Sequence, residues 1–158
     1  MACRPNKPLR EISPRCGLSL KGRWWFPIFT AKHVLMARPI TKKNFKAAVL
    51  NHDKPVVVDV WADWCGPCHM LAPNFKAAEE AVDGKARFVK LDAEKNQSLV
   101  RKYQVRSLPT LLFFKDGELV DRNVGVVSKG AIINRLKPLL NEEDRTELSS
   151  GKWWKFWA

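Results

Sequence analysis

Apolar and polar positions alternate in two different ways along the middle of this 158-residue chain. Between about residues 40 and 141, short β-branched runs are interleaved with segments whose apolar residues recur every three or four positions. These two periods are typical of strands and helices that pack on each other. We therefore predict an α/β domain over residues 40–141. Its central mixed sheet would combine a parallel unit with an antiparallel hairpin, flanked by helices on both faces.

The predicted elements follow one another as a strand–helix–strand unit and a later hairpin. Residues 56–62 form an almost unbroken apolar run, as in a strand that is covered on both faces. The dipeptide Asp116-Gly117 separates two further runs and is a strong hairpin signal. The expected helices cover residues 41–49, 65–82, 97–103 and 128–139, with Pro138 expected to end or bend the last one. The expected strands cover residues 56–62, 87–91, 110–114 and 119–124.

The net charge of +12 suggests nucleic acid as a partner, but it is unevenly distributed. Residues 1–39 alone contain eight basic residues and one acidic residue, a net of +7, whereas residues 40–141 carry +6 and residues 142–158 carry −1. No groove-reading motif accompanies this charge, so we expect no nucleic-acid binding. No apolar run approaches the roughly 20 residues that are needed to span a bilayer.

We interpret residues 1–39 as a basic extension, because they show no sustained helical or strand period. A plain disordered tail is one possibility, and a functional chain that begins at Met36 is another. A transit peptide would also be basic and poor in acids. We favour either of the first two, because the extension has few serines and no clear amphipathic helix.

The clearest chemical signal is the motif W-C-G-P-C, residues 64–68, where a buried strand turns into a helix. Cys65 falls at the helix N-terminus, where unpaired N–H groups and the helix dipole favour an anion. We therefore expect its pKa to lie below the ordinary thiol value of about 8.5. Cys68, one turn further on, is expected to be less exposed and close enough for a disulfide with Cys65. The pair is predicted to be a dithiol switch with an exposed attacking sulfur and a buried resolving sulfur.

Two metal-centred alternatives use the same cysteines. A zinc site needs further ligands, but Cys3 and Cys16 are separated by twelve residues and form no second C-x-x-C pair. The order from Cys65 to His69 also matches C-x-x-C-H, the attachment pattern of c-type haem. Haem needs space beside both sulfurs, whereas this pair opens a packed helix. We expect no metal, and interpret His69 as a surface residue.

Beyond the motif, the chain resembles the thioredoxin family over about residues 40–141. The matching segments have the family's order and spacing, and they are residues 57–68, 90–92, 108–110, 114–117 and 124–125. The resemblance implies a thioredoxin fold and a protein-disulfide reductase activity. Cys65 would attack a substrate disulfide to give a mixed disulfide, and Cys68 would then attack the Cys65 sulfur and release the reduced substrate.

The resemblance also implies an acid/base residue in the strand before the cysteines. Asp59 is an acid inside a valine-rich strand, so burial should raise its pKa. By analogy with the family it would serve Cys68 as acid and base, directly or through a water molecule, with Lys90 tuning it. A purely structural acid that is satisfied by Lys90 is the alternative, and we favour the catalytic role.

Leu108-Pro109 would contain the family's cis-proline, which leaves the Leu108 backbone free to pair with an extended substrate. On sequence alone a trans proline is the expected form, and only the resemblance reverses this. The implied apolar rim of the docking surface consists of Trp64, Gly66, Pro67, Gly125 and Val126.

The resemblance implies a reducing oxidoreductase that contributes to cell redox homeostasis, because Gly66-Pro67 between the cysteines is typical of the reducing members. It implies no bound cofactor, with electrons supplied from NADPH by a thioredoxin reductase. The expected protein is a monomer that acts on disulfide-containing clients in the cytoplasm. An organelle is the alternative if residues 1–35 are a transit peptide. A binding module or holdase with an incidental dithiol is the second functional hypothesis.

Residues 142–158 are interpreted as a tail without a counterpart in the resemblance. The last eight residues combine two lysines with four aromatics, Trp153, Trp154, Phe156 and Trp157. Tryptophan next to lysine is typical of membrane interfaces, which makes a weak membrane-surface contact one hypothesis. Eight residues bury little area, however, and anionic lipid would repel the acidic run 142–144. We favour packing onto the domain or a tail without a contact.

Overall fold

The computed structural model of the protein describes residues 37–149. Several features singled out in the sequence lie outside these residues. They are Cys3, Cys16, the alternative start Met36 and the aromatic run 153–157. The site predicted around the two cysteines lies entirely within them.

Five strands form one mixed sheet in the order β1-β3-β2-β4-β5. β1, β3 and β2 are parallel, β4 runs antiparallel to β2, and β5 runs antiparallel to β4. The predicted parallel unit and hairpin are therefore confirmed. β1 has only three residues, which is too short for a recognisable period. The strands are β1 (Arg38–Ile40), β2 (Val56–Trp61), β3 (Arg87–Asp92), β4 (Thr110–Lys115) and β5 (Glu118–Val124).

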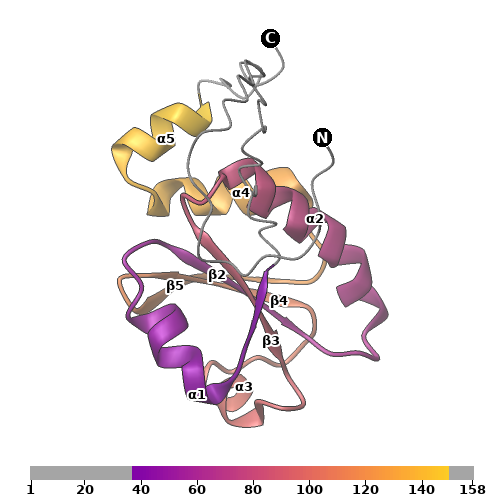
Figure 1. Ribbon diagram of the computed structural model, residues 1–158. Helices are drawn as coiled ribbons and strands as arrows, with labels where there is room; N and C mark the ends of the chain where they lie inside the picture. The colour runs from indigo at the N-terminus through magenta and orange to yellow at the C-terminus, as the bar shows by residue number, and fades with distance from the viewer. Residues whose placement is uncertain (1–36, 150–158) are drawn as a thin grey trace, which may run out of the picture. The chain divides into compact units, whose positions relative to one another are not determined.

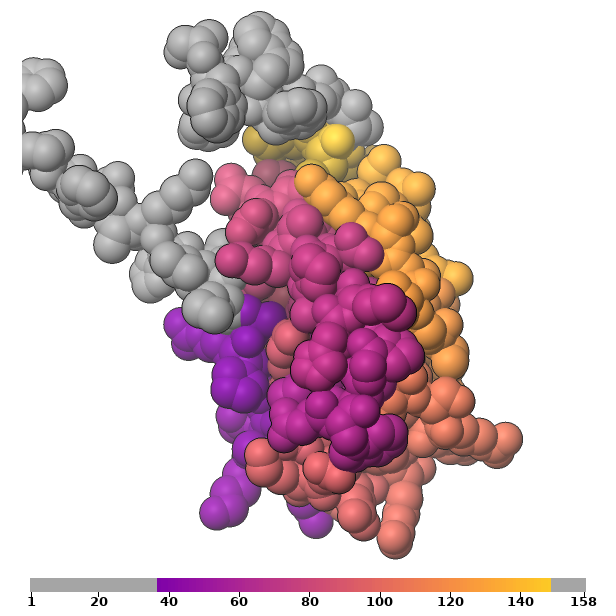
Figure 2. All heavy atoms as spheres, turned by 90° about the vertical axis from the view of Figure 1, so that its right-hand side faces the viewer, coloured from indigo at the N-terminus to yellow at the C-terminus, as the bar shows by residue number. Residues whose placement is uncertain are grey.

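Helices cover both faces of the sheet, as predicted (Figure 1). α2 (Gly66–Val82) and α4 (Lys129–Leu136) pack on one face, and Figure 2 shows α2 in magenta across the front of the molecule. The other face is covered by α1 (Lys42–Phe45), by its π-helical continuation η1 (Lys46–Leu50) and by α3 (Gln97–Lys102). α4 ends at Leu136 and is followed directly by the short 3-10 helix η2 (Lys137–Leu139). η2 contains Pro138, which was expected to end or bend the last helix.

A further helix, α5 (Glu142–Ser149), lies in the segment that we interpreted as a tail. Its first turn holds three acidic residues, which suit the positive end of a helix dipole. Leu148 packs against the hydrophobic cluster between the sheet and helices α2 and α4. Lys85 Nζ forms an ion pair with Glu147 Oε2 at 2.9 Å. Leu148 is the one large apolar residue of α5, so the segment shows no helical repeat of apolar positions, and the sequence did not predict this helix.

The alternation of side chains along the central strands decides what each face contains. In β2, Val57 points to the α2 and α4 face, whereas Val58 points to the α1 and α3 face. Asp59 lies two residues after Val57 and therefore shares its face. Its neighbours across the sheet are Lys90 in β3 and Leu111 in β4. The register thus places one carboxyl group under α2, in the layer that carries the cysteines.

The turn between β4 and β5 passes close to the end of η1. Gly117 in this turn has φ +83°, and a Cβ atom built on it would lie 2.7 Å from the Leu50 carbonyl oxygen. Glycine is needed here for two reasons, the positive φ and the close approach of two backbones.

We expect Gly117→Ala to lower the free energy of unfolding by about 2–4 kcal/mol, because it adds a steric overlap to the cost of a positive φ. Gly84→Ala is the matched control, since Gly84 has φ +76° and no atom lies within 4 Å of its built Cβ. It should lose only about 1–2 kcal/mol. Denaturant unfolding at one pH measures both values. Equal losses would show that the approach to Leu50 imposes no constraint.

Candidate active site

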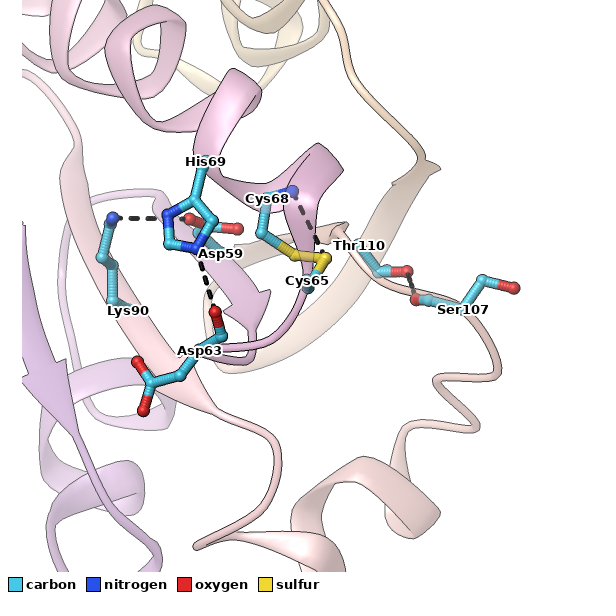
Figure 3. The surroundings of a disulfide bond; sticks show 8 residues. All are labelled: Asp59, Asp63, Cys65, Cys68, His69, Lys90, Ser107 and Thr110. Atoms are coloured by element: carbon cyan, nitrogen blue, oxygen red, sulfur yellow. Dashed lines mark hydrogen bonds and ion pairs between the residues drawn. A yellow bond between two sulfur atoms is a disulfide. The ribbon is translucent and has the colours of Figure 1, made fainter.

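The chain turns from β2 into α2 at the two cysteines (Figure 3). Cys65 is the N-cap residue of α2 and has extended backbone angles. Pro67 lies in the first turn, where no helical hydrogen bond requires its missing N–H. The Cys68 N–H donates to the Cys65 carbonyl oxygen at 3.0 Å and to Cys65 Sγ at 3.3 Å. A donor of the first turn therefore points at the Cys65 sulfur, as expected for a site that favours a thiolate.

Cys65 and Cys68 are joined by a disulfide bond with an S–S distance of 2.07 Å. Each of the two residues is only 4% exposed. The expected contrast between an exposed Cys65 and a less exposed Cys68 is therefore wrong for the disulfide form. The reason is packing, because Ala62 is buried with both cysteines and Trp61 and Leu108 pack against this cluster.

Asp59 is 1% exposed, and neither of its carboxyl oxygens has a hydrogen-bond partner among the described residues. Lys90 Nζ lies 3.9 Å from Asp59 Oδ2 and also 5.6 Å from the centre of the Trp61 ring. Burial raises the pKa of Asp59 to about 6, while the positive charge of Lys90 opposes this rise. The carboxyl group can therefore hold or release a proton close to neutral pH.

The Leu108-Pro109 peptide bond is cis. The Pro109 carbonyl oxygen accepts a hydrogen bond of 2.8 Å from the N–H of Gly125, which has φ +93°. This bond joins two of the predicted docking segments. Val126 follows Gly125 and is exposed. In the described part of the chain, the N–H and C=O groups of Leu108 form no hydrogen bond.

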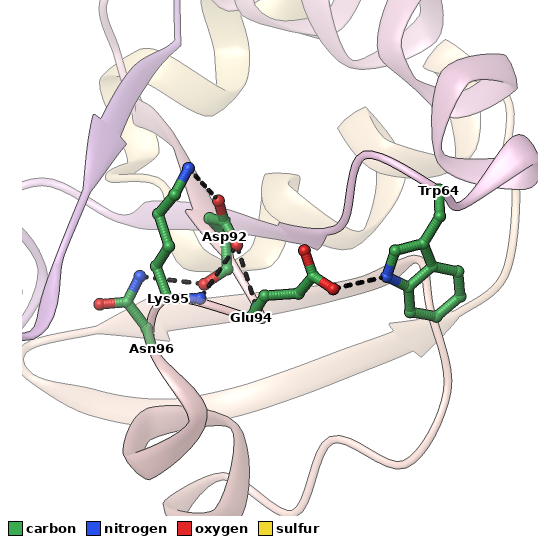
Figure 4. Close-up of polar contacts among 5 residues, drawn as sticks. All are labelled: Trp64, Asp92, Glu94, Lys95 and Asn96. Carbon is green, nitrogen blue, oxygen red and sulfur yellow. Dashed lines mark hydrogen bonds and ion pairs between the residues drawn. The ribbon is translucent and has the colours of Figure 1, made fainter.

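Trp64 forms the opposite side of the predicted rim and is 71% exposed. Its Nε1–H donates to Glu94 Oε1 at 2.9 Å (Figure 4). Glu94 is placed by Asp92, whose Oδ1 accepts the backbone N–H groups of Glu94 and Lys95. No local pattern could have indicated Glu94, because the contact joins two distant segments. The other rim residues of this side, Gly66 and Pro67, are exposed.

Two further residues of α2, His69 in its first turn and Glu79 near its C-terminal end, bear on the sequence interpretation. His69 is exposed, as predicted, and its Nε2–H donates to the Asp63 carbonyl oxygen at 3.0 Å. Glu79 on α2 is 5% exposed and was not singled out. Burial raises the pKa of Glu79 to about 7, and a hydrogen bond from the Ala37 backbone opposes this rise. Glu79 falls on the inward stripe with Phe75 and Val82, so the helical period could have revealed it.

Comparison with known proteins now identifies the family. The family model described as Thioredoxin matches residues 36–138. The chain belongs to the thioredoxin family. It is 38% identical over 99 residues to the thioredoxin of Rickettsia felis, covering 63% of this chain and 94% of that protein. The thioredoxin of Porphyra purpurea is 39% identical over 102 residues, 65% and 95% of the two chains. Thioredoxin 1 of a Nostoc species is 42% identical over 101 residues, 64% and 94% of the two chains.

The family and the geometry agree on the chemistry of the site. The Cys65–Cys68 pair makes the chain a thiol–disulfide oxidoreductase with protein-disulfide reductase activity. Thioredoxins need no bound cofactor. Within residues 37–149, no group of three or more His, Cys, Asp or Glu side chains could hold a metal ion. No helix in that part of the chain is long and apolar enough to cross a membrane.

Asp59 gives stability a specific pH dependence. Its folded-state pKa of about 6 lies above the usual 3.8, so folding disfavours the ionised form. The resulting loss of stability develops as the pH rises from about 3.8 to about 6 and is constant above that. Asp59→Asn should therefore become more stable relative to wild type by about 3 kcal/mol over this interval. Denaturant unfolding of both disulfide-bonded proteins between pH 4 and 8 measures the difference. A pH-independent difference would contradict the raised pKa.

Proposed function

We propose that this chain reduces disulfide bonds of client proteins and thereby contributes to cell redox homeostasis. The observation that carries the proposal is the Cys65–Cys68 pair at the start of α2, with the buried carboxyl of Asp59 on the sheet face below. The proposal concerns the direction of the reaction and its partners, because disulfide exchange itself follows from the family.

Each cycle begins with both cysteines reduced. The Cys65 thiolate attacks one client sulfur, the client disulfide breaks, and the leaving client sulfur takes up a proton. The Cys68 thiolate then attacks Cys65 Sγ, which breaks the mixed disulfide and releases the second client thiol after protonation. Two electrons pass from the dithiol to the client, and the chain ends with the Cys65–Cys68 disulfide.

The second step requires Cys68 to lose its proton in a buried site. Asp59 serves as the base, directly or through a water molecule, because its pKa of about 6 allows it to accept and return a proton near neutral pH. Lys90 favours the ionised carboxylate and so lowers the pH above which Asp59 is ionised and can accept a proton. The absence of hydrogen bonds to Asp59 from the described residues leaves both of its oxygens open to this role.

The client chain docks beside the disulfide in an extended form. The Leu108 N–H and C=O groups have no partner in the described structure and can pair with the client backbone. Exposed apolar side chains at Trp64 and Val126 provide contact on either side. Gly66, Pro67 and Gly125 have no side chain or only a short ring, so they obstruct the client's approach to the sulfurs little.

The oxidised chain must be reduced again before the next cycle. The family implies a thioredoxin reductase and disulfide clients as partners in general. We propose that a flavin-dependent thioredoxin reductase passes electrons from NADPH to Cys65–Cys68, and that the chain carries them as a monomer. A reducing cytoplasm suits a dithiol that must be reduced, with an organelle as the alternative if residues 1–35 are a transit peptide. Membrane-surface contact through the aromatic run 153–157 stays a prediction.

Cysteine variants test the proposed reduction directly. In an insulin-type reduction assay with a thioredoxin reductase and NADPH, Cys65→Ser should fall to the uncatalysed rate. Cys68→Ser should stop at the mixed disulfide, which mass spectrometry detects as a covalent adduct on Cys65. A redox titration of wild type should give a strongly reducing potential. A redox-silent pair, or full activity in Cys65→Ser, would instead support the binding module or holdase.

The role of Asp59 predicts a second kinetic result. Asp59→Asn should slow release of the client from the mixed disulfide about ten- to a hundredfold at pH 7, because the buried Cys68 loses its base. The inflection near pH 6 in the wild-type profile of this step should also disappear. Rapid-mixing measurements of client release between pH 5 and 9 follow the step separately from the attack by Cys65. An unchanged profile would show that Asp59 is only structural.

A further inference from the structure

An open pocket of about 310 Å³ lies beside the cis-proline loop. Its walls are the loop of residues 104–107, Thr110 at the start of β4, and Arg122 and Val124 at the end of β5. Val124 is an exposed apolar side chain. The pocket therefore combines polar, apolar and positively charged groups on the sheet edge formed by β5.

The pocket is continuous with the docking surface of the proposed function. Thr110 directly follows Pro109, and its hydroxyl donates to the Ser107 carbonyl oxygen at 2.6 Å. Both residues belong to the surroundings of the disulfide drawn in Figure 3. Thr110 also lies opposite Val124 in the antiparallel pairing of β4 and β5. The N–H of the next residue, Gly125, donates a hydrogen bond to the Pro109 carbonyl oxygen. A client that pairs with the Leu108 backbone therefore passes along the rim of this pocket.

Two arginines line the pocket, and no acidic residue does. Arg122 is anchored, because its guanidinium donates to the carbonyl oxygens of Tyr103 at 3.0 Å and Gln104 at 3.4 Å. Arg106 is exposed, and its guanidinium has no hydrogen bond or ion pair within the described part of the chain. The acid next to Arg122 in sequence is Asp121, which is paired with Arg135 at 2.7 Å.

The exposed acidic residues near the disulfide lie on its other side. Glu94 accepts a hydrogen bond from Trp64, and Asp63 directly precedes Trp64 in the chain. The surface around the disulfide is therefore polarised, with acids beside Trp64 and two unneutralised arginines beside the cis-proline. Such a surface favours clients whose charges are arranged in the opposite sense.

We propose that this pocket binds an acidic side chain of the client, Asp or Glu, close to the disulfide that is reduced, and that Arg106 determines this preference. The planar guanidinium suits a carboxylate, and the exposed Ser107 hydroxyl adds a donor. An extended client rises about 3.3 Å per residue, so an acid within three residues of the reactive cysteine lies within about 10 Å of it. The proposal rests on the proposed function, because it concerns which disulfides are reduced.

A peptide series tests the preference. Each peptide carries one disulfide, and a single Glu is moved from three residues before to three residues after one cysteine, with Gln at the same position as its reference. Rapid mixing with the fully reduced full-length protein gives the second-order rate constant. At one or more positions, Glu should raise this constant about three- to tenfold over Gln at low salt. The preference should shrink as the ionic strength rises.

Arg106→Gln should abolish the preference, so that each Glu peptide reacts with the same rate constant as its Gln reference. Arg101→Gln is the matched control, because Arg101 is an exposed arginine on α3 outside the pocket, and it should keep the preference. If no position favours Glu, or if the preference survives in Arg106→Gln, the pocket has no such role. In either case continued reduction of the Gln peptides leaves the proposed function intact. Failure of wild type to reduce any peptide would overturn both.

Discussion

The site depends on one carboxyl group, that of Asp59, which the fold holds almost entirely out of bulk solvent. β2 is covered on both faces, so every residue of this strand is assigned to one helical layer by the alternation of side chains. A shift of register by one residue would move Asp59 away from α2. Such a shift would also take the carboxyl group away from Lys90 and into the apolar cluster around Val58. The packing that stabilises the fold is thus the same packing that makes Asp59 an unusually weak acid, with a pKa of about 6.

The antiparallel direction of β4 brings the remaining parts of the site to the same end of the sheet. β2 leads into the cysteines where it ends, whereas β4 begins beside that end, directly after Pro109. The bond from Gly125 to Pro109 then adds the end of β5. Three connections far apart in sequence therefore meet around one disulfide. None of them needs a bound group to hold it, because backbone hydrogen bonds and the shared cluster of Ala62 and the cysteines fix their positions.

Local patterns in the sequence were sufficient for most elements and for the reacting residues. Four strands, the start of α2 at Cys65 and the roles implied for the W-C-G-P-C motif all depend on neighbours within a few residues. The features that the sequence did not predict are either very short elements or depend on contacts between distant segments. β1 has three residues, α5 packs on the domain through contacts such as Leu148 and the Lys85–Glu147 ion pair, and Glu94 meets Trp64 only in the fold. The burial of Cys65 also depends on a distant segment, because Leu108 packs against the cluster that contains both cysteines.

A disulfide bond is chemically uniform, so selection among clients must come from the residues around it. In this chain the loop that carries Arg106 is fixed at both ends. Arg122 binds the carbonyl groups at its start, and the cis-proline and its bond to Gly125 hold its end. A preformed loop loses little conformational freedom when a client docks. A single exposed charge is worth little when it must also be ordered. Held on a rigid rim beside the reacting sulfurs, the same charge can discriminate between clients while the chemistry at Cys65 and Cys68 stays the same.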